Sequence, residues 1–254
     1  MKLLGLARDL RRRKARERRG LFVAEGVRTV EALCASSLEV TGVLALRNAG
    51  SADPRLAALH DALRDRGVPL VTVGEAEFRS AADTDSPQGV LAIAAVPARR
   101  LDAASLGPNR PLLLLDGVQD PGNVGTIVRT AAAFGAAATL ALPGTVDLWN
   151  AKVVRSAMGA LFDYPALPCT WDAFDAFRSE HDLALWGADA RGAALDRGVP
   201  RPPALALVIG NEGAGLSAEA QARVSDLVAL PISGAVESLN AAVAAGIFLY
   251  ELTR

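Results

Sequence analysis

Short, uninterrupted apolar runs alternate with helical stretches through the C-terminal part of the chain, and this alternation constrains the fold most. Each run has four or five residues, too few for a surface helix, and lacks the polar alternation of a half-exposed strand. A mainly parallel sheet covered by helices is therefore expected, an α/β fold. The expected strands are 112–115, 138–142, 183–186, 205–209 and 227–230, and the expected helices are 122–134, 149–161, 171–180 and 238–253.

The first hundred residues are expected to form a smaller α/β unit. Apolar runs at 42–46, 68–73 and 90–96 predict strands, and 54–66 has the spacing of a helix. The segment that follows, 96–111, carries the strongest linker signal because it holds three prolines and a glycine among polar residues. The predicted organisation is an N-terminal domain at 1–100, a linker at 101–110 and a C-terminal domain at 111–254.

Composition excludes several classes of protein. With 51% hydrophobic residues, the 254-residue chain can bury a sizeable core. No run approaches the roughly 18 apolar residues of a membrane span, and the charged N-terminus lacks the apolar stretch of a secretory signal. We therefore expect a cytoplasmic protein without a membrane partner. Its two cysteines, Cys34 and Cys169, stand far apart, and its two histidines form no ligand pattern, so no metal site is expected.

Positive charge is concentrated at the N-terminus. Residues 2–19 contain nine basic and two acidic side chains, a formal net charge of +7, although the whole chain carries −1. Such a cluster is typical of a surface that contacts phosphates, and a solvated helix face is the alternative. Leu3, Leu6 and Leu10 recur at helical spacing, so a helix should present the arginines on its exposed face. The candidate nucleic-acid contacts are Arg11, Arg12, Arg13 and Arg16.

Three loops beyond the predicted strands carry glycine and polar residues, where parallel sheets bind ligands. The first, DGVQDPGNVGTIVR from Asp116, leads from a strand into a helix. Asn123 is placed to cap that helix, and Arg129 lies about two turns inside it. An arginine on a mostly apolar helix needs a partner. That partner is either the carboxylate of Asp116 or Asp120, or a phosphate, which suits the planar guanidinium donors.

The second loop, 209–216, has three glycines within six residues, which lets its backbone approach a ligand closely. Its spacing is G-x-x-G-x-G, and the next strand ends at Leu230 without an acidic residue to hold a ribose. Both features disfavour a nicotinamide-dependent oxidoreductase. The third loop, 230–240, places Ser238 and Asn240 at a helix start, and capping alone explains Ser238 equally well.

Together and in this order, the three motifs resemble the SpoU family, also called the TrmH family, of the SPOUT methyltransferases. The matching stretches are DGVQDPGNVGTIVRTAAAFGA from Asp116, LVIGNEGAGLS from Leu207 and LPISGAVESLNAAVAAGIFLYE from Leu230. The resemblance as a whole covers nearly all of residues 111–254. The N-terminal KLLGLARDLRRRKARERRGLFVAEG looks like the substrate-binding extension of the ribosomal-RNA branch of that family.

The resemblance implies an enzyme that transfers a methyl group from S-adenosylmethionine to a ribose 2′-hydroxyl of structured RNA, most of all large-subunit ribosomal RNA. It also implies a deep trefoil knot in the C-terminal domain, which general rules on chain threading would not predict. The cofactor contacts carried over are Gly187, Gly210, Asn211, Leu230, Ile232 and Leu239.

A homodimer is implied as well. The closing helix is too apolar to face water, so part of it should be covered by the core or by a second copy. The residues expected to be buried in this way are Val243, Ala244, Ile247 and Phe248. Arg155, within 152–156, is a candidate RNA contact supplied by the partner subunit, and a surface helix charge is the alternative.

A ribose hydroxyl is a poor nucleophile, so the enzyme must align it with the methyl donor and assist the loss of its proton. No histidine stands in the three motifs. The resemblance assigns this task to Arg129, which stays protonated at working pH, so we expect electrostatic stabilisation and leave proton transfer open. Ser238 is expected to hydrogen-bond Glu212 or Asn123. The predicted catalytic set is Arg129, Asn123, Glu212, Ser238 and Asn240.

Two other functions fit the same fold. One is a transfer-RNA 2′-O-methyltransferase, which differs only in the RNA that the N-terminal domain binds. The other is a catalytically silent RNA-binding or ribosome-assembly factor. The joint presence of five polar site residues argues against a silent factor, because an inactive site has no chemical need for all of them.

Overall fold

The computed structural model describes residues 2–47, 49–104, 106–196, 198–233, 236 and 238–254. Contacts divide the chain into two compact units, which we describe one at a time. Unit 1 contains Met1–Ala98 and Trp149–Asp163, and unit 2 contains Arg99–Leu148 and Tyr164–Arg254. The segment 149–163, which the sequence assigns to the C-terminal domain, thus has its contacts with the N-terminal residues. Among the described residues, no helix is long and apolar enough to cross a membrane.

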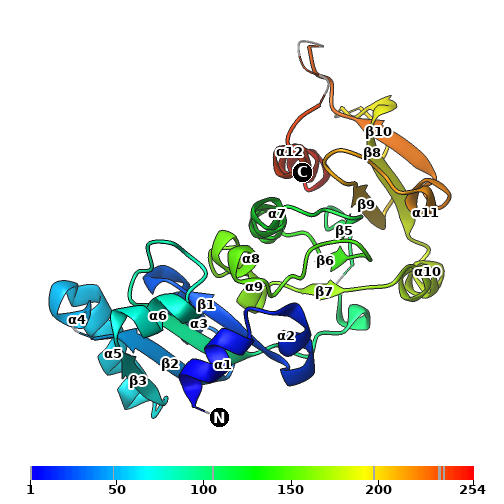
Figure 1. Ribbon diagram of the computed structural model, residues 1–254. Coiled ribbons are helices and arrows are strands. Elements are labelled where there is room, and N and C mark those ends of the chain that lie inside the picture. The colour runs from blue at the N-terminus through cyan, green and yellow to red at the C-terminus, as the bar shows by residue number, and fades with distance from the viewer. Residues whose placement is uncertain (1, 48, 105, 197, 234–235, 237) are drawn as a thin grey trace. The chain divides into compact units, whose positions relative to one another are not determined.

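Unit 1 is built on a four-stranded sheet with the order β1-β4-β2-β3, of which β1, β2 and β3 are labelled in Figure 1. Strands β2 and β3 run parallel, whereas β4 is antiparallel to both β1 and β2. The three predicted strands are present, and β1 was not predicted because its five residues directly follow the basic segment. The strands are β1 (Leu21–Glu25), β2 (Val40–Leu46), β3 (Leu70–Val73) and β4 (Val90–Ala95). Among the helices are α3 (Val27–Ala35), α4 (Ala49–Ala52), α5 (Pro54–Asp65) and α6 (Glu75–Ala81).

The basic segment forms two helices, α1 (Leu3–Asp9) and α2 (Arg13–Arg19), and not the single helix predicted from leucine spacing. Arg16 explains the break. Its guanidinium donates to the carbonyl oxygens of Leu10 at 2.8 Å and of Arg11 at 2.9 Å, groups that lie just beyond the end of α1. Arg16 is buried in this role, with 5% of its surface exposed.

The segment 149–163 also differs from the single helix expected there. It forms α8 (Ala151–Ser156) and α9 (Ala160–Asp163), separated by a turn in which Met158 and Gly159 have φ values of 50° and 91°. A Cβ atom at Gly159 would lie 2.7 Å from the Cβ atom of Ala32, so the close packing of this turn requires glycine. The Phe22 ring packs against the rings of Trp149 and Phe162, with distances between ring centroids of 4.5 and 5.9 Å.

Unit 2 is built on a six-stranded sheet with the order β10-β8-β9-β5-β6-β7, in which every pairing is parallel (Figure 1). The predicted α/β fold with a mainly parallel sheet is therefore confirmed. The trefoil knot stays a prediction. The strands are β5 (Leu112–Leu115), β6 (Ala138–Ala141), β7 (Ala166–Pro168), β8 (Ala184–Ala194), β9 (Leu205–Ile209) and β10 (Asp226–Ala229).

Burial explains the apolar runs of unit 2. All residues of β5, β6 and β9 are buried, because helices cover a parallel sheet on both of its faces. The longest helices of unit 2 are α7, α10 and α12, and α12 lies along α7. A Cβ atom on Gly246 of α12 would lie 3.5 Å from a methyl carbon of Thr130 on α7. The helices are α7 (Pro121–Ala133), α10 (Trp171–Glu180), α11 (Ala218–Gln221) and α12 (Ala241–Leu252), with a 3-10 turn, η1 (Leu101–Ala103).

We predict that Phe22→Ala lowers the free energy of unfolding of unit 1 by about 3 to 5 kcal/mol, because it empties a fully buried aromatic site between Trp149 and Phe162. Denaturant titration measures this loss. Val71→Ala is the control, because Val71 is 42% exposed on β3 and its truncation should cost about 0.5 kcal/mol or less. Equal losses in the two variants would show that this aromatic cluster does not hold 149–163 in the unit.

Candidate active site

The Glu212 carboxylate connects two of the three motif loops. Glu212 follows β9, and it accepts hydrogen bonds from the backbone N–H groups of Gln119 at 3.2 Å and Asp120 at 3.1 Å, in the loop after β5. It also accepts one from Nδ2 of Asn123 at 3.0 Å. Because β5 and β9 are paired neighbours in a parallel sheet, their carboxyl ends bring these loops together.

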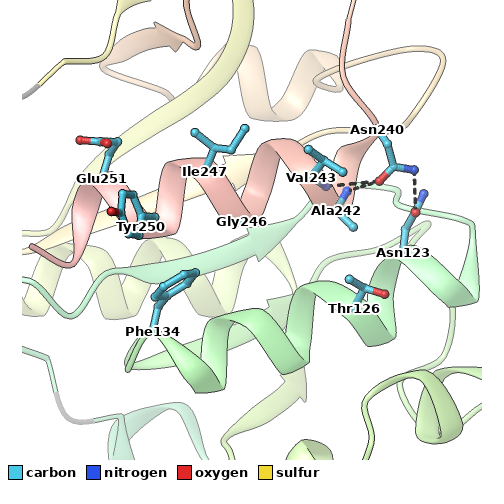
Figure 2. Close-up of a pocket in the computed structure, with 10 residues that line it drawn as sticks. All are labelled: Asn123, Thr126, Phe134, Asn240, Ala242, Val243, Gly246, Ile247, Tyr250 and Glu251. Atoms are coloured by element: carbon cyan, nitrogen blue, oxygen red, sulfur yellow. Dashed lines mark hydrogen bonds between the residues drawn. The ribbon is translucent and has the colours of Figure 1, made fainter.

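Asn123 extends the connection to the third motif. Its Oδ1 atom accepts a hydrogen bond from Nδ2 of Asn240 at 3.0 Å (Figure 2). Asn240 is the N-cap of α12, and its Oδ1 atom accepts from the backbone N–H groups of Ala242 at 2.9 Å and Val243 at 3.3 Å. One chain of side-chain hydrogen bonds thus joins Glu212, Asn123 and Asn240, three residues that were predicted to belong to one catalytic set.

The prediction that Asn123 caps α7 is wrong. The N-cap is Asp120, whose Oδ1 atom accepts from the backbone N–H of Asn123 at 2.8 Å, and Pro121 takes the first helical position, which needs no N–H donor. Asn123 lies within the first turn of the helix. Its side-chain amide is therefore free of capping and can bond Glu212 and Asn240.

Glu212 is held as a carboxylate. Its partial burial raises the pKa, but the hydrogen bonds from the Asn123 side chain and from the backbone N–H groups of Asp120 and Gln119 outweigh that effect and lower the pKa below its ordinary value. The negative charge is thus stabilised by donors from the first motif. Protonation of Glu212 would weaken the connection between the loops.

The glycine-bearing loop after β9 is a tight backbone hairpin. Asn211 and Gly215 exchange backbone hydrogen bonds of 2.9 and 3.0 Å, and a Cβ atom at Gly210 would lie 2.4 Å from the carbonyl group of Gly215. No side chain fits at Gly210. Nδ2 of Asn211 donates to the carbonyl oxygen of Gly117 at 2.8 Å, which ties this hairpin to the first motif. The loop therefore presents backbone groups at fixed positions.

A cavity of about 650 Å³ lies beside this hairpin, at the carboxyl ends of β8, β9 and β10. Its wall combines apolar side chains with backbone groups, which is typical of pockets that bind small molecules or cofactors. Five of the six predicted cofactor contacts line the cavity, and so do two predicted catalytic residues. These residues are Gly210, Asn211, Leu230, Ile232 and Leu239, together with Glu212 and Ser238.

Gly187 is placed differently from the other predicted cofactor contacts. It is buried, and a Cβ atom there would lie 2.7 Å from a methyl carbon of Leu216 and 3.1 Å from one of Leu227. Its neighbour Ala188 lines the cavity instead. Gly187 thus lets β8 pack closely against the interior, and the next residues along the strand reach the cavity.

Two charged residues of the cavity wall, Asp189 and Arg191, were not predicted. Arg191 donates to the two carboxylate oxygens of Asp189 at 2.9 and 2.8 Å, and these bonds lower the pKa of Asp189. The strand was predicted to end at 186, and Gly187 was the one residue directly beyond it that was selected, so Asp189 and Arg191 were not expected to line a cavity. The rule that ligands bind at carboxyl ends of strands would have pointed to them.

Arg129 lies exposed on α7, and its guanidinium forms no ion pair or hydrogen bond with any residue that the structure describes. The salt bridges weighed from the sequence are absent, since Asp116 accepts from the backbone N–H of Ser217 at 2.7 Å and Asp120 caps the helix. The guanidinium is therefore available to an external anion. Its place on the helix that also carries Asn123 puts it in the same structural element as the network.

Ser238 lines the cavity but makes no hydrogen bond to Glu212 or Asn123, so that expected contact is wrong for these described residues. Residues 234, 235 and 237 of the third motif lie outside the described residues. Within the described part of the chain, no group of three or more His, Cys, Asp or Glu side chains is arranged to hold a metal ion.

A second hollow, a groove of about 660 Å³, runs between α7 and α12 (Figure 2). Phe134 and Tyr250 meet there edge to face at 5.8 Å. Of the α12 residues expected to be buried, Phe248 is 3% exposed, whereas Val243 and Ile247 are 51% and 41% exposed in the single chain. Ala244 is half-buried and lines the cofactor-sized cavity.

The predicted RNA contacts of unit 1 fall into two groups. Arg16 is buried and bonded to backbone carbonyls, so it supports the fold and presents little surface to a ligand. Arg155 on α8 forms an ion pair with Asp83 at 3.5 Å and is about one-third exposed. The exposed predicted contacts are Arg11, Arg12 and Arg13.

Comparison with known families agrees with this geometry. The model of the SpoU rRNA Methylase family matches residues 110–250, more than half of the chain. The chain belongs to the SpoU family. The family predicted from the three motifs is therefore confirmed. The model of an MRM3-like substrate binding domain matches residues 6–92, so the N-terminal part of this SpoU-family chain resembles a substrate-binding domain.

Curated relatives include 23S rRNA 2′-O-methyltransferases. A 23S rRNA (guanosine(2553)-2′-O)-methyltransferase, RlmP, of Bacillus subtilis (strain 168) is 35% identical over 74% of this chain and 74% of its own length. A 23S rRNA (guanosine-2′-O-)-methyltransferase, RlmB, of Photobacterium profundum is 32% identical over 90% of this chain and 96% of its own.

Solved structures of similar fold cover the whole chain. The SpoU methyltransferase AviRb from Streptomyces viridochromogenes, crystallised in complex with AdoMet, has a TM-score of 0.87 and 28% identity over 100% of this chain and 97% of that one. An AdoMet-bound rRNA methyltransferase from Sinorhizobium meliloti has a TM-score of 0.82 and 27% identity over 99% of this chain and 94% of that one.

We predict that Glu212→Gln lowers the melting temperature near pH 7, because an amide cannot accept all the hydrogen bonds that converge on the carboxylate. The lowered pKa sets the pH window. A carboxyl whose folded-state pKa is depressed stabilises the fold above its unfolded value, near 4.5, and loses that contribution as the pH falls through the folded value.

Melting curves of wild type and Glu212→Gln should therefore differ most near pH 7 and converge toward about pH 3. Glu219→Gln is the matched control, because Glu219 is exposed on α11 in the same unit, and its variant should follow the wild type throughout. A Glu212→Gln difference that is the same at both pH values would contradict the role given to the carboxylate.

Proposed function

We propose that this chain transfers a methyl group from S-adenosylmethionine to the 2′-hydroxyl of a ribose in large-subunit ribosomal RNA. The observation that carries the proposal is the network of Glu212, Asn123 and Asn240, which assembles three loops beside a cofactor-sized cavity and beside the helix that bears Arg129. The relatives named as 23S rRNA 2′-O-methyltransferases support ribosomal RNA over transfer RNA.

The cavity fits S-adenosylmethionine. Its volume of about 650 Å³ lies in the range of small-molecule sites, and apolar Leu230, Ile232 and Leu239 offer surface for an adenine ring. The cofactor supplies, when bound, a methyl group made electrophilic by its sulfonium. Arg191 neutralises Asp189 in the wall, so Glu212 leaves one net negative charge there, which suits a cationic cofactor. The hairpin at Gly210 brings backbone N–H and C=O groups to the wall, where they can recognise a base edge.

Arg129 acts on the RNA side of the reaction. Its guanidinium binds the phosphate next to the reacting ribose and stabilises negative charge as it develops on the 2′-oxygen. It stays protonated at working pH, so in this proposal it positions and stabilises and does not serve as the resting base. The side-chain amide of Asn123 hydrogen-bonds to Glu212 and Asn240. These bonds fix the start of α7 and thereby the helix from which Arg129 projects.

The protein acts as a homodimer in this proposal, with a second copy of the chain covering the groove between α7 and α12. Single exposed apolar side chains are common, but several gathered along one groove favour an interface. Four large hydrophobic residues that line this groove are more than a third exposed: Phe134, Val243, Ile247 and Tyr250.

The N-terminal unit binds the RNA through its exposed arginines, with Arg155 of the partner subunit or of the same chain as an additional contact. A substrate in the large ribosomal subunit places the protein in the cytoplasm. The match of residues 6–92 to a substrate-binding domain supports the assignment of RNA binding to the N-terminal unit.

We predict that Arg129→Ala leaves the affinity for S-adenosylmethionine within a few-fold of wild type but reduces methyl transfer by about 100-fold or more, the scale of losing a charge-stabilising donor. Calorimetry measures the affinity, and transfer of labelled methyl to 23S ribosomal RNA measures the rate. Arg129→Lys should recover little, because an ammonium cannot reproduce the planar donors.

Arg110→Ala is the control for Arg129. Arg110 is also exposed, but it precedes β5 at the amino end of that strand, whereas the motif loops follow the carboxyl ends, so its variant should keep full activity. Loss of cofactor binding in Arg129→Ala would instead give this residue a structural role. Full activity of Arg129→Ala would remove it from the reaction.

We predict that Val243→Asp converts the dimer into a monomer in sedimentation velocity at micromolar concentration, because it buries a charge without a partner in the proposed interface. Val71→Asp, at a similarly exposed valine of β3 in unit 1, should leave the dimer intact. A monomeric wild type, or a dimeric Val243→Asp variant, would contradict the proposed interface.

A further inference from the structure

The carboxylate of Asp9 is the common partner of three arginines. Asp9 is the last residue of α1, and its side chain is only 12% exposed. Arg12 bonds one carboxylate oxygen, while Arg18 at 3.3 Å and Arg19 at 3.1 Å approach the other. Arg12 lies between the two helices and the other two arginines lie on α2, so the three guanidiniums reach Asp9 from separate positions of the chain.

The position of Asp9 is electrostatically unusual. A carboxylate at the C-terminal end of a helix faces the negative end of the helix dipole and is disfavoured there. The three arginines offset that cost, and the hydrogen bonds from Arg12 and Arg19 lower the pKa of Asp9. Three positive charges around one negative charge leave a local excess of two. The cluster therefore still attracts an anion after Asp9 has been counted.

The outer edges of this cluster face solvent. The side chains of Arg12 and Arg18 are 75% and 68% exposed, and each guanidinium has five N–H donors. One nitrogen of Arg12 and one of Arg18 contact Asp9, which leaves the others directed at solvent or at a ligand. Two guanidiniums held by the same carboxylate offer several N–H donors near one point, and a phosphate accepts such donors.

The surrounding segment is also held in place. Nε of Arg8 donates to Oγ of Ser80 at 2.8 Å, and Arg11 donates to the carbonyl oxygen of the same serine at 3.4 Å. These bonds fasten the helix pair to α6. Arginines that are already ordered lose less side-chain entropy when they bind, so a fixed cluster binds an anion better than the same charges on a mobile arm.

We propose that Asp9 is a positioning residue that holds Arg12, Arg18 and Arg19 as a preformed site for a backbone phosphate of the RNA substrate. This inference rests on the proposed function, because it concerns how the N-terminal unit grips the RNA. It adds Arg18 and Arg19, which the motif reasoning did not select, to the RNA-binding surface, and it replaces the buried Arg16. According to this proposal, a negatively charged residue increases the affinity of the protein for a polyanion, the RNA.

The proposal can be tested because a pure charge effect and a positioning effect predict opposite changes in RNA affinity. Asp9→Asn raises the net charge of the surface by one, but it replaces a carboxylate that accepts from three arginines with an amide that has one uncharged acceptor oxygen and a donor NH2 group. If charge alone mattered, the variant would bind RNA more tightly and with a steeper salt dependence. If Asp9 positions the arginines, binding to a 23S ribosomal RNA transcript should weaken by about 3-fold to 10-fold, and the logarithmic salt slope should fall by roughly 0.7 to 0.9 for each phosphate that the arginines no longer bind.

Glu17→Gln is the matched control. It removes the same charge from the same segment, where Glu17 forms an exposed pair with Arg13 at 2.7 Å on one helix face. Its RNA affinity should equal or slightly exceed that of the wild type. RNA binding by Asp9→Asn that is as tight as wild type, in a protein with unchanged circular dichroism, would overturn the proposal.

A second variant covers the case in which Asp9→Asn loses its fold. Lysines at Arg12 and Arg18 keep every charge and can still pair with Asp9, but they lack the planar fork. The Arg12→Lys, Arg18→Lys double variant should bind RNA about 3-fold or more weakly, and unchanged affinity would overturn the proposal. Failure of the wild type to bind or methylate RNA would instead contradict the proposed function, which keeps the two failures distinct.

Discussion

The Glu212 carboxylate accepts three hydrogen bonds from the first motif, and Asn123 passes the connection on to Asn240 at the start of α12. The side-chain bonds of this network join residues that are 89 and 117 positions apart in the chain. Such contacts form only if the parallel sheet first brings the carboxyl ends of β5 and β9 together. The cavity, the hairpin at Gly210 and the helix that carries Arg129 all take their places from this arrangement.

Much of the C-terminal fold follows from the sequence, because buried parallel strands leave continuous apolar runs. The strands at 112–115 and 205–209 and the helix at 171–180 have the predicted bounds. Departures occur where tertiary contacts override local pattern. Arg16 binds the carbonyls beyond α1 and breaks the predicted first helix, and the close approach of Gly159 to Ala32 breaks the helix expected at 149–161.

The candidate site was predictable where residue type and loop position both carried information. Glycine and polar residues beyond the strands marked the loops, and the resemblance to the SpoU family selected Gly210, Asn211, Glu212 and Asn240 within them. The structure brings these loops together. Hydrogen-bond partners were harder to predict, since helical capping by Asp120 or Asn123 depends on a shift of three residues. The pairing of Asp9 with distant arginines has no signature in sequence spacing, because two of them are nine and ten residues away.

In the proposed reaction, the methyl group is attached to the 2′-oxygen of a ribose and not to a base. Wild-type protein, 23S ribosomal RNA and S-adenosylmethionine with a radiolabelled methyl group are incubated together, and the RNA is then hydrolysed with alkali. Alkaline cleavage requires a free 2′-hydroxyl, so methylation of the ribose leaves the label in alkali-stable dinucleotides. We predict that the label is recovered there. Label in mononucleotides, which would mark a methylated base, or no transfer to the RNA, would contradict the account.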